Sequence, residues 1–147
     1  MPETARPAPD FRSRRWRWGN AFVGLLARAG WGPIQLLTVA GRRTGRQYTV
    51  PVVPVEESGR LWLVAPYGTV GWVENARAAD RVSLRYGRTT RHYKLREAGP
   101  EESGPVLKRY VAVATKTRPH FTATKDSPVA EFVAEAGLHP VFELTPA

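Results

Sequence analysis

A glycine-flanked basic segment, residues 41–46 with the sequence GRRTGR, lies between two apolar runs of the chain. Glycine adopts positive φ without steric cost, so Gly41 and Gly45 allow the backbone to turn its amides toward a bound group. The arginines of the segment carry forked donors that match the oxygens of a phosphate or a carboxylate. The segment therefore predicts a binding site for an anionic group. The alternative is the solvated tip of a β-hairpin, which has the same composition.

Few other side chains have the spacing that a self-sufficient catalytic site requires. His92, His120 and His139 are far apart, and we expect neither an i, i+4 pairing nor a neighbouring carboxylate for them, which argues against a metal site. The sequence has no cysteine, no Gly-x-Ser-x-Gly elbow and no phosphate-binding P-loop. Its glutamate pairs, at 56–57 and 101–102, have the positions expected of a turn and a helix start. If the protein is an enzyme, a bound cofactor must supply the reactive group.

Composition limits the class of protein. The chain has 147 residues, 42% of them hydrophobic, which suits one compact domain with a buried core. A formal net charge of +9 favours an anionic partner, which could be nucleic acid, anionic lipid or a polyanionic cofactor. We expect no nucleic acid, because the aromatic residues do not alternate with basic residues as in a stacking platform. The absence of cysteine and of a run of roughly 20 apolar residues is compatible with a cytoplasmic protein.

The first 30 residues differ in composition from the rest of the chain. Residues 1–12 contain three prolines and few apolar side chains, and we expect a disordered lead-in. Residues 13–29 place Trp18, Phe22 and Leu25 at helical spacing among arginines, which predicts a basic amphipathic helix. Such a helix either lies on an anionic membrane, at the inner face of the cell membrane, or caps the folded domain. Residues 31–147 are expected to form that domain.

Short apolar runs between glycines and prolines predict a mostly antiparallel sheet. Most connections are too short for parallel crossovers, so the strands are expected to pair as hairpins, the first three as a meander. Helices between the hairpins give an α+β fold, a small barrel with flanking helices. The expected strands are residues 34–39, 48–55, 61–65, 82–86, 89–95 and 141–144, and the expected helices are residues 72–79, 100–115 and 129–136.

Four motifs, taken in order, resemble the deazaflavin-dependent nitroreductase family. They are residues 37–45 (LTVAGRRTG), Pro51 in the next expected strand, residues 65–68 (APYG) and residues 72–78 (WVENARA). The resemblance covers most of residues 31–147. It implies a split β-barrel, of the kind that also binds FMN, and a cofactor-binding domain for coenzyme F-420. This coenzyme is a deazaflavin with a phosphodiester and a polyglutamate tail, and such a tail matches the basic segment.

The resemblance also implies which residues form the coenzyme site. The tail would meet the arginines and amides of the loop, and the ring would lie on the strand that follows, opposite the residues after the third strand. The implied coenzyme-binding residues are Gly41, Arg42, Arg43, Thr44, Gly45, Arg46, Val50, Pro51, Val52, Ala65, Pro66, Tyr67, Gly68, Trp72 and Asn75. No metal is implied.

An oxidoreductase is the activity that the resemblance implies, with a hydride passing from reduced coenzyme F-420 to a quinone, an enone or a nitroaromatic. Tyr67, Tyr48 or His120 would deliver the accompanying proton as catalytic groups, unless solvent does. Residues 115–121, TKTRPHF, replace a tyrosine-rich stretch of some members, which implies a different acceptor. The alternatives are an FMN-binding flavoprotein and a non-catalytic protein that binds the coenzyme or lipid at a membrane surface. The assembly is expected to be a monomer or a homodimer.

Overall fold

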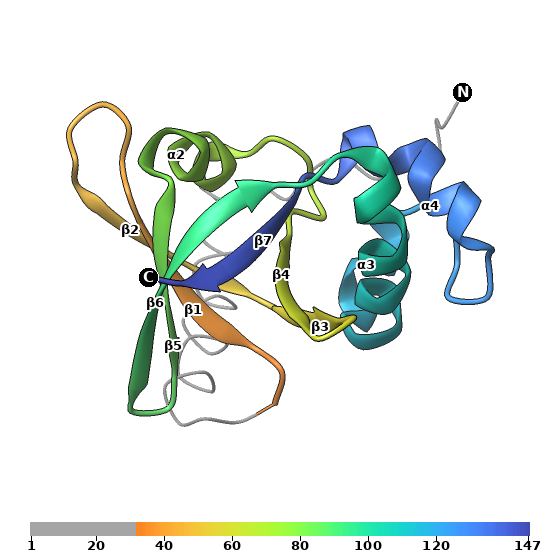
Figure 1. Ribbon diagram of the computed structural model, residues 1–147, viewed down its shortest axis with the longest axis horizontal. Coiled ribbons are helices and arrows are strands. Elements are labelled where there is room, and N and C mark those ends of the chain that lie inside the picture. Colours follow the sequence, from red (N-terminus) through yellow and green to blue (C-terminus); the bar gives the residue numbers. More distant parts are fainter. Residues whose placement is uncertain (1–31) are drawn as a thin grey trace.

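One curled antiparallel sheet organises residues 32–147, the part of the chain that the computed structural model describes (Figure 1). Its strand order is β2-β1-β5-β6-β7-β4-β3. The strands are β1 (Gln35–Ala40), β2 (Gln47–Val52), β3 (Val55–Glu57), β4 (Arg60–Val64), β5 (Arg81–Tyr86), β6 (Thr89–Glu97) and β7 (Val141–Pro146). The helices are α2 (Gly71–Ala79), α3 (Pro100–Val113) and α4 (Val129–Glu135), with the 3-10 helices η1 (Thr115–His120) and η2 (Ala136–Leu138). The expected α+β class is confirmed.

Tight turns close two of the hairpins where the sequence places its small turn residues. Between β3 and β4, Ser58 and Gly59 have φ angles of 54° and 73°, and two successive positive φ angles are typical of the turn that best fits the twist of a hairpin. Between β5 and β6, Gly87 has a φ of 62°. Both hairpins were expected from the sequence and are confirmed.

The expected meander of the first strands is wrong. Residues 48–55 do not form one strand, because the chain leaves the sheet at Val53 and Pro54 and the proline has no N–H to donate to a ladder. β2 and β3 therefore lie at opposite edges of the sheet. The break has a packing reason, since Val52 belongs to the apolar cluster around α2 whereas Val55 belongs to the cluster around α3.

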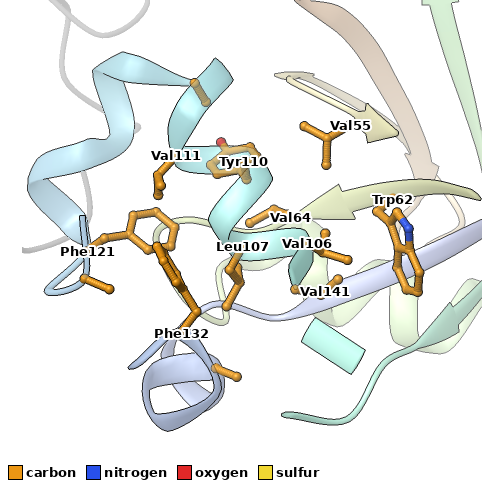
Figure 2. Packing of buried hydrophobic residues seen from close by; sticks show 13 residues of the cluster. Val55, Trp62, Val64, Val106, Leu107, Tyr110, Val111, Phe121, Phe132 and Val141 are labelled. Atoms are coloured by element: carbon orange, nitrogen blue, oxygen red, sulfur yellow. The ribbon is translucent and has the colours of Figure 1, made fainter. Parts of the chain in front are cut away.

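Two apolar clusters hold the helices on the sheet. Figure 2 shows the larger one, in which Leu107 of α3 and Phe132 of α4 lie among side chains from β3, β4 and β7. Gly104 permits the close approach of the two helices, because a Cβ at this position would lie 2.6 Å from Cγ2 of Val133. The second cluster packs Val73 and its neighbours on α2 against β1, β5 and β7. Figure 1 accordingly shows α2 at one end of the sheet and α3 with α4 at the other.

Three further expectations concern residues 1–31, residues 115–120 and membrane spanning. The expected lead-in over residues 1–12 and the expected helix over residues 13–29 lie outside the described residues. The helix expected over residues 100–115 ends at Val113, and residues 115–120 form the 3-10 helix η1. Among residues 32–147, every helix is too short or too polar to span a lipid bilayer.

Candidate functional site

A cleft of about 430 Å³ opens between the β1–β2 loop and the start of α2. Residues 41–44 of the loop form one wall, and Gly71, Trp72 and Asn75 of α2 form the opposite wall. Tyr48 and Val50 of the edge strand β2 form the floor between them. This volume is in the range of sites that bind small molecules and cofactors.

Asn75 anchors the loop to the helix. Its Oδ1 accepts hydrogen bonds from the backbone N of Arg42 at 3.1 Å and from Nη1 of Arg42 at 2.8 Å. The Nη2 of the same arginine lies 2.8 Å from Oε2 of Glu74. Asn75 is buried, whereas Arg42 and Glu74 are partly exposed. Both terminal nitrogens of the Arg42 guanidinium group therefore have a partner on α2, and these contacts join the two walls of the cleft.

The two glycines of the loop have different roles. Gly45 has a φ of 74°, as expected from its position at the end of the turn. Gly41 does not have a positive φ, so the expectation that both glycines serve the turn by positive φ is wrong for this residue. Its role is close approach, because a Cβ on Gly41 would lie 2.6 Å from Cε2 of Tyr48 and 3.2 Å from the carbonyl oxygen of Arg46. The Tyr48 ring thus lies directly against the loop backbone.

The positive charge at the cleft is unevenly distributed. Glu74 offsets the charge of Arg42. Arg43 and Arg46 are exposed, and neither has an ion pair with any of residues 32–147. Gly71 is the first residue of α2, so the positive end of the helix dipole also faces the cleft. An anionic group at the mouth of the cleft would meet Arg43 and this helix end first.

The walls of the cleft are suited to a flat ring. Tyr48 is 47% exposed although it is a large aromatic residue, and its ring is available to a ligand. Trp72 is partly buried, with its ring centroid 6.1 Å from that of Phe142 in the core. Val50 completes an apolar surface between the two aromatic residues. Aromatic side chains inside the cleft and arginines at its rim suit a planar heterocycle that carries a phosphate or carboxylate tail.

The expected coenzyme residues divide between this cleft and a second segment. Gly45 and Arg46 complete the loop beyond the cleft lining, and Pro51 and Val52 continue β2. Residues 65–68 lie after β4 and do not line the cleft. They lead directly to Gly71 and Trp72, because Val70 precedes α2 and its carbonyl oxygen accepts from Val73 N at 3.0 Å.

Two of the three expected proton donors contact each other, Tyr67 from residues 65–68 and His120 from the end of η1. The rings of Tyr67 and His120 are edge to face, with centroids 4.6 Å apart. Burial raises the pKa of the Tyr67 phenol, so this group holds its proton at neutral pH. The third expected donor, Tyr48, lies in the cleft itself. The structure thus separates the three residues into one pair and one single group.

A buried pair that was not expected from the sequence contacts residues 65–68 through the carbonyl oxygen of Pro66. His139 Nε2 is 3.0 Å from Oε1 of Glu135, four residues earlier, and both side chains are buried. The expectation that no histidine has a neighbouring carboxylate is therefore wrong for His139. The sequence carried one signal, since Glu135 and His139 are four residues apart at the end of the helix expected over residues 129–136. No group of three or more metal-ligating side chains occurs within residues 32–147.

Comparison with known proteins identifies a family and a fold. The model of the family described as F420H(2)-dependent quinone reductase matches residues 10–130. A solved structure described as a domain-swapped dimer is 25% identical, covers 88% of this chain and 98% of its own, and superposes with a TM-score of 0.58. An F420-H2-dependent reductase, FDR-A, is 28% identical, covers 77% of this chain and 94% of its own, and has a TM-score of 0.50.

A more distant likeness concerns the fold alone. An FAD-binding protein from Mesorhizobium loti is 15% identical, covers 86% of this chain and 89% of its own, and has a TM-score of 0.51. Together with the curled antiparallel sheet, this likeness confirms the split-barrel fold class that the sequence motifs implied.

Proposed function

This chain belongs to the F420H(2)-dependent quinone reductase family and is an oxidoreductase, and from that premise we propose that it reduces a quinone with reduced coenzyme F-420. When bound, the coenzyme supplies a hydride. The quinone gains this hydride and one proton and becomes a hydroquinone, while the coenzyme is oxidised. The observation that carries the proposal is the cleft between the β1–β2 loop and α2, with aromatic walls and a cationic rim.

In this proposal the loop holds the anionic tail and the cleft holds the ring. Arg43 and Arg46 bind the phosphate and carboxylates, and Arg42 keeps the loop at a fixed distance from α2 through Asn75. Tyr48, Val50 and Trp72 orient the ring. Of the remaining expected coenzyme residues, Pro51 and residues 66–68 extend the ring surface beyond the cleft, whereas Val52 and Ala65 are buried in the apolar cluster around α2. Catalysis then comes mainly from positioning, because two oriented ring systems react as if the transfer were intramolecular.

The proton that accompanies the hydride comes from the pair formed by Tyr67 and His120. Burial raises the pKa of Tyr67, which keeps the phenol protonated, and the Tyr67 ring contacts the His120 ring edge to face. Tyr48 is the alternative donor, because it is exposed in the cleft. Tyr67→Phe and Tyr48→Phe separate the two possibilities. The variant that lacks the donor loses turnover while its coenzyme affinity is kept.

Oxidation of the reduced coenzyme by a panel of quinones, enones and nitroaromatics tests the proposed activity. We expect turnover with quinones at the highest kcat/KM. Absence of turnover with every acceptor, although the coenzyme binds, would show a binding protein instead of an enzyme. Competition with FMN tests the cofactor. Tighter binding of FMN than of coenzyme F-420 would replace the proposal by an FMN flavoprotein.

We infer that the protein is a homodimer, because the match to a solved structure described as a domain-swapped dimer extends over 98% of that structure's chain. In this chain β2 and β3 are edge strands and have free ladder positions. Light scattering with size-exclusion chromatography measures the mass in solution. A mass close to 16.4 kDa at all concentrations would show a monomer.

The role of the first 30 residues is tested separately. We propose that residues 31–147 bind the coenzyme by themselves and that residues 13–29 attach the protein to anionic lipid. Vesicles of anionic and of neutral lipid are sedimented with the full chain and with a chain that begins at residue 31. Equal sedimentation of the two chains would remove the membrane role.

A further inference from the structure

The buried pair of His139 and Glu135 is bonded at every polar atom. His139 is 2% exposed and Glu135 is 9% exposed. His139 Nδ1 lies 2.9 Å from the carbonyl oxygen of Pro66, and Nε2 lies 3.0 Å from Oε1 of Glu135. A carbonyl oxygen only accepts, so Nδ1 carries a proton and donates it to Pro66.

Glu135 and Phe121 fix the orientation of the imidazole ring. The carboxylate of Glu135 also accepts from the backbone N of Thr122 at 3.2 Å and of Ala123 at 2.8 Å. The Phe121 ring stacks on the imidazole with centroids 3.9 Å apart and an interplanar angle of 21°. The ring therefore has no freedom to turn away from Pro66. Such a fully bonded buried group holds its neighbours more rigidly than an apolar contact of the same size.

The carbonyl that His139 holds belongs to the segment that leads to the cleft. Ala65 N donates to the carbonyl oxygen of Pro140 at 2.8 Å, so the start of the segment is also tied to the chain around His139. Gly68 has a φ of 85°, and Val70 N donates back to its carbonyl oxygen at 2.9 Å. The next two residues, Gly71 and Trp72, form the α2 wall of the cleft. A tightly turned path of four residues thus separates the Pro66 carbonyl from that wall.

We propose that His139, oriented by Glu135, is a positioning residue for the cleft: its bond to the Pro66 carbonyl sets the position of residues 65–70 and thereby of Gly71 and Trp72. The inference rests on the proposed function in one respect only, namely that the cleft holds the coenzyme. The pair itself does not touch the reacting atoms. Its role differs from ordinary core packing because it depends on one donor directed at one carbonyl.

Two substitutions separate this role from packing. An asparagine at 139 places its amide nitrogen where His Nδ1 lies and keeps the bond to Pro66, whereas a glutamine places its nitrogen where His Nε2 lies and keeps the bond to Glu135. Both remove the stacked ring, so His139→Asn and His139→Gln are matched controls for stability. Hydrogen exchange of the amides of residues 65–72 is measured on the free protein. Coenzyme affinity and turnover are measured on the same samples.

We expect His139→Asn to keep the exchange protection of residues 65–72 and to bind the coenzyme within about twofold of the native chain. We expect His139→Gln to lose that protection and to bind the coenzyme about tenfold more weakly, the change that loss of one hydrogen bond to the segment supports. Equal exchange in the two variants would overturn the proposal. A different result is that the native chain shows no coenzyme binding at all, while His139→Gln still loses exchange protection. That result would support the positioning role and overturn the proposed function.

A third variant covers the case in which a substitution at 139 prevents folding. Glu135→Gln removes one bond to the backbone of residues 122–123 and keeps the bond from His139 to Pro66. It is expected to unfold at a lower temperature and to keep the exchange protection of residues 65–72. Loss of that protection in Glu135→Gln, to the same extent as in the rest of the protein, would show a packing role and overturn the proposal.

Discussion

The two ends of the sheet are held together in different ways. At one end, α3 and α4 share a closed apolar cluster in which Leu107 and Phe132 are fully buried (Figure 2). At the other end, α2 is joined to the β1–β2 loop by a few polar contacts from Arg42, and the large ring of Tyr48 remains exposed. Both ends have a buried apolar cluster, but the β1–β2 loop at the second end is joined to α2 by polar contacts, and this end retains the space and the charge that a ligand requires.

The largest expected effect is on the stability of the α3 end. Leu107→Ala removes a fully buried side chain, so the free energy of unfolding should fall by about 2 to 5 kcal/mol. Denaturant unfolding measures this change, and coenzyme affinity of the folded protein should stay within about twofold, because α3 does not line the cleft. A loss of affinity as large as the loss of stability would show that the two ends are not independent.

The next effect concerns the polar joint at the α2 end. Asn75→Ala removes the acceptor of two hydrogen bonds from Arg42 and should lower the free energy of unfolding by about 1 to 2 kcal/mol. Coenzyme affinity should fall more than stability does, since the loop loses its anchor. Asn75→Asp keeps the acceptor oxygen and is the matched control. The joint has no role in binding if the alanine variant binds as the native chain does.

A smaller effect is expected at Gly41. The added methyl group of Gly41→Ala would meet the Tyr48 ring, and exposure allows that ring to move, so the free energy of unfolding should fall by less than about 1 kcal/mol. Coenzyme affinity should fall as the ring leaves its position. A double-mutant cycle with Tyr48→Ala measures the coupling of the two positions. Additive effects would mean that the close approach of loop and ring is unimportant.

The smallest expected effect is the pH dependence that His139 adds to stability. Burial lowers the pKa of His139 below its ordinary value of 6.5, so the unfolded chain binds a proton there more readily than the folded protein does. Its contribution is therefore present above pH 6.5 and is lost as the pH falls through the lowered pKa. Thermal unfolding of the native chain and of His139→Asn over this range compares the two. Parallel pH curves would contradict the assignment.

The sequence was sufficient to predict those elements whose structure depends on neighbouring residues. The glycine-marked hairpins, the helix after residue 71 and the basic loop follow from neighbouring residues, and the structure places them as expected. The position of β2 and β3 at opposite edges of the sheet could not be predicted, because it depends on which cluster buries Val52 and which buries Val55. The bond from His139 to Pro66 joins residues 73 positions apart, and no local pattern marks it.

For the candidate site, the sequence indicated the residues better than it indicated their arrangement. The motifs indicated both Arg42 and Asn75, and the structure shows that they bind each other, which leaves Arg43 and Arg46 to meet a ligand. Glu74 had no expected role, because the sequence does not show that its carboxylate reaches Arg42 from the first turn of α2. The charge balance of the cleft is a tertiary property, and composition alone gives only its sign.

We propose above all that the exposed arginines of the β1–β2 loop, Arg43 and Arg46, bind the anionic tail of coenzyme F-420. The most direct measurement is the dissociation constant of the coenzyme for Arg43→Ala, beside Arg88→Ala as a control in the distant β5–β6 turn. We predict that Arg43→Ala binds the coenzyme about tenfold to a hundredfold more weakly, with a reduced dependence on salt, and that Arg88→Ala binds it unchanged. Equal dissociation constants for the two variants would contradict it.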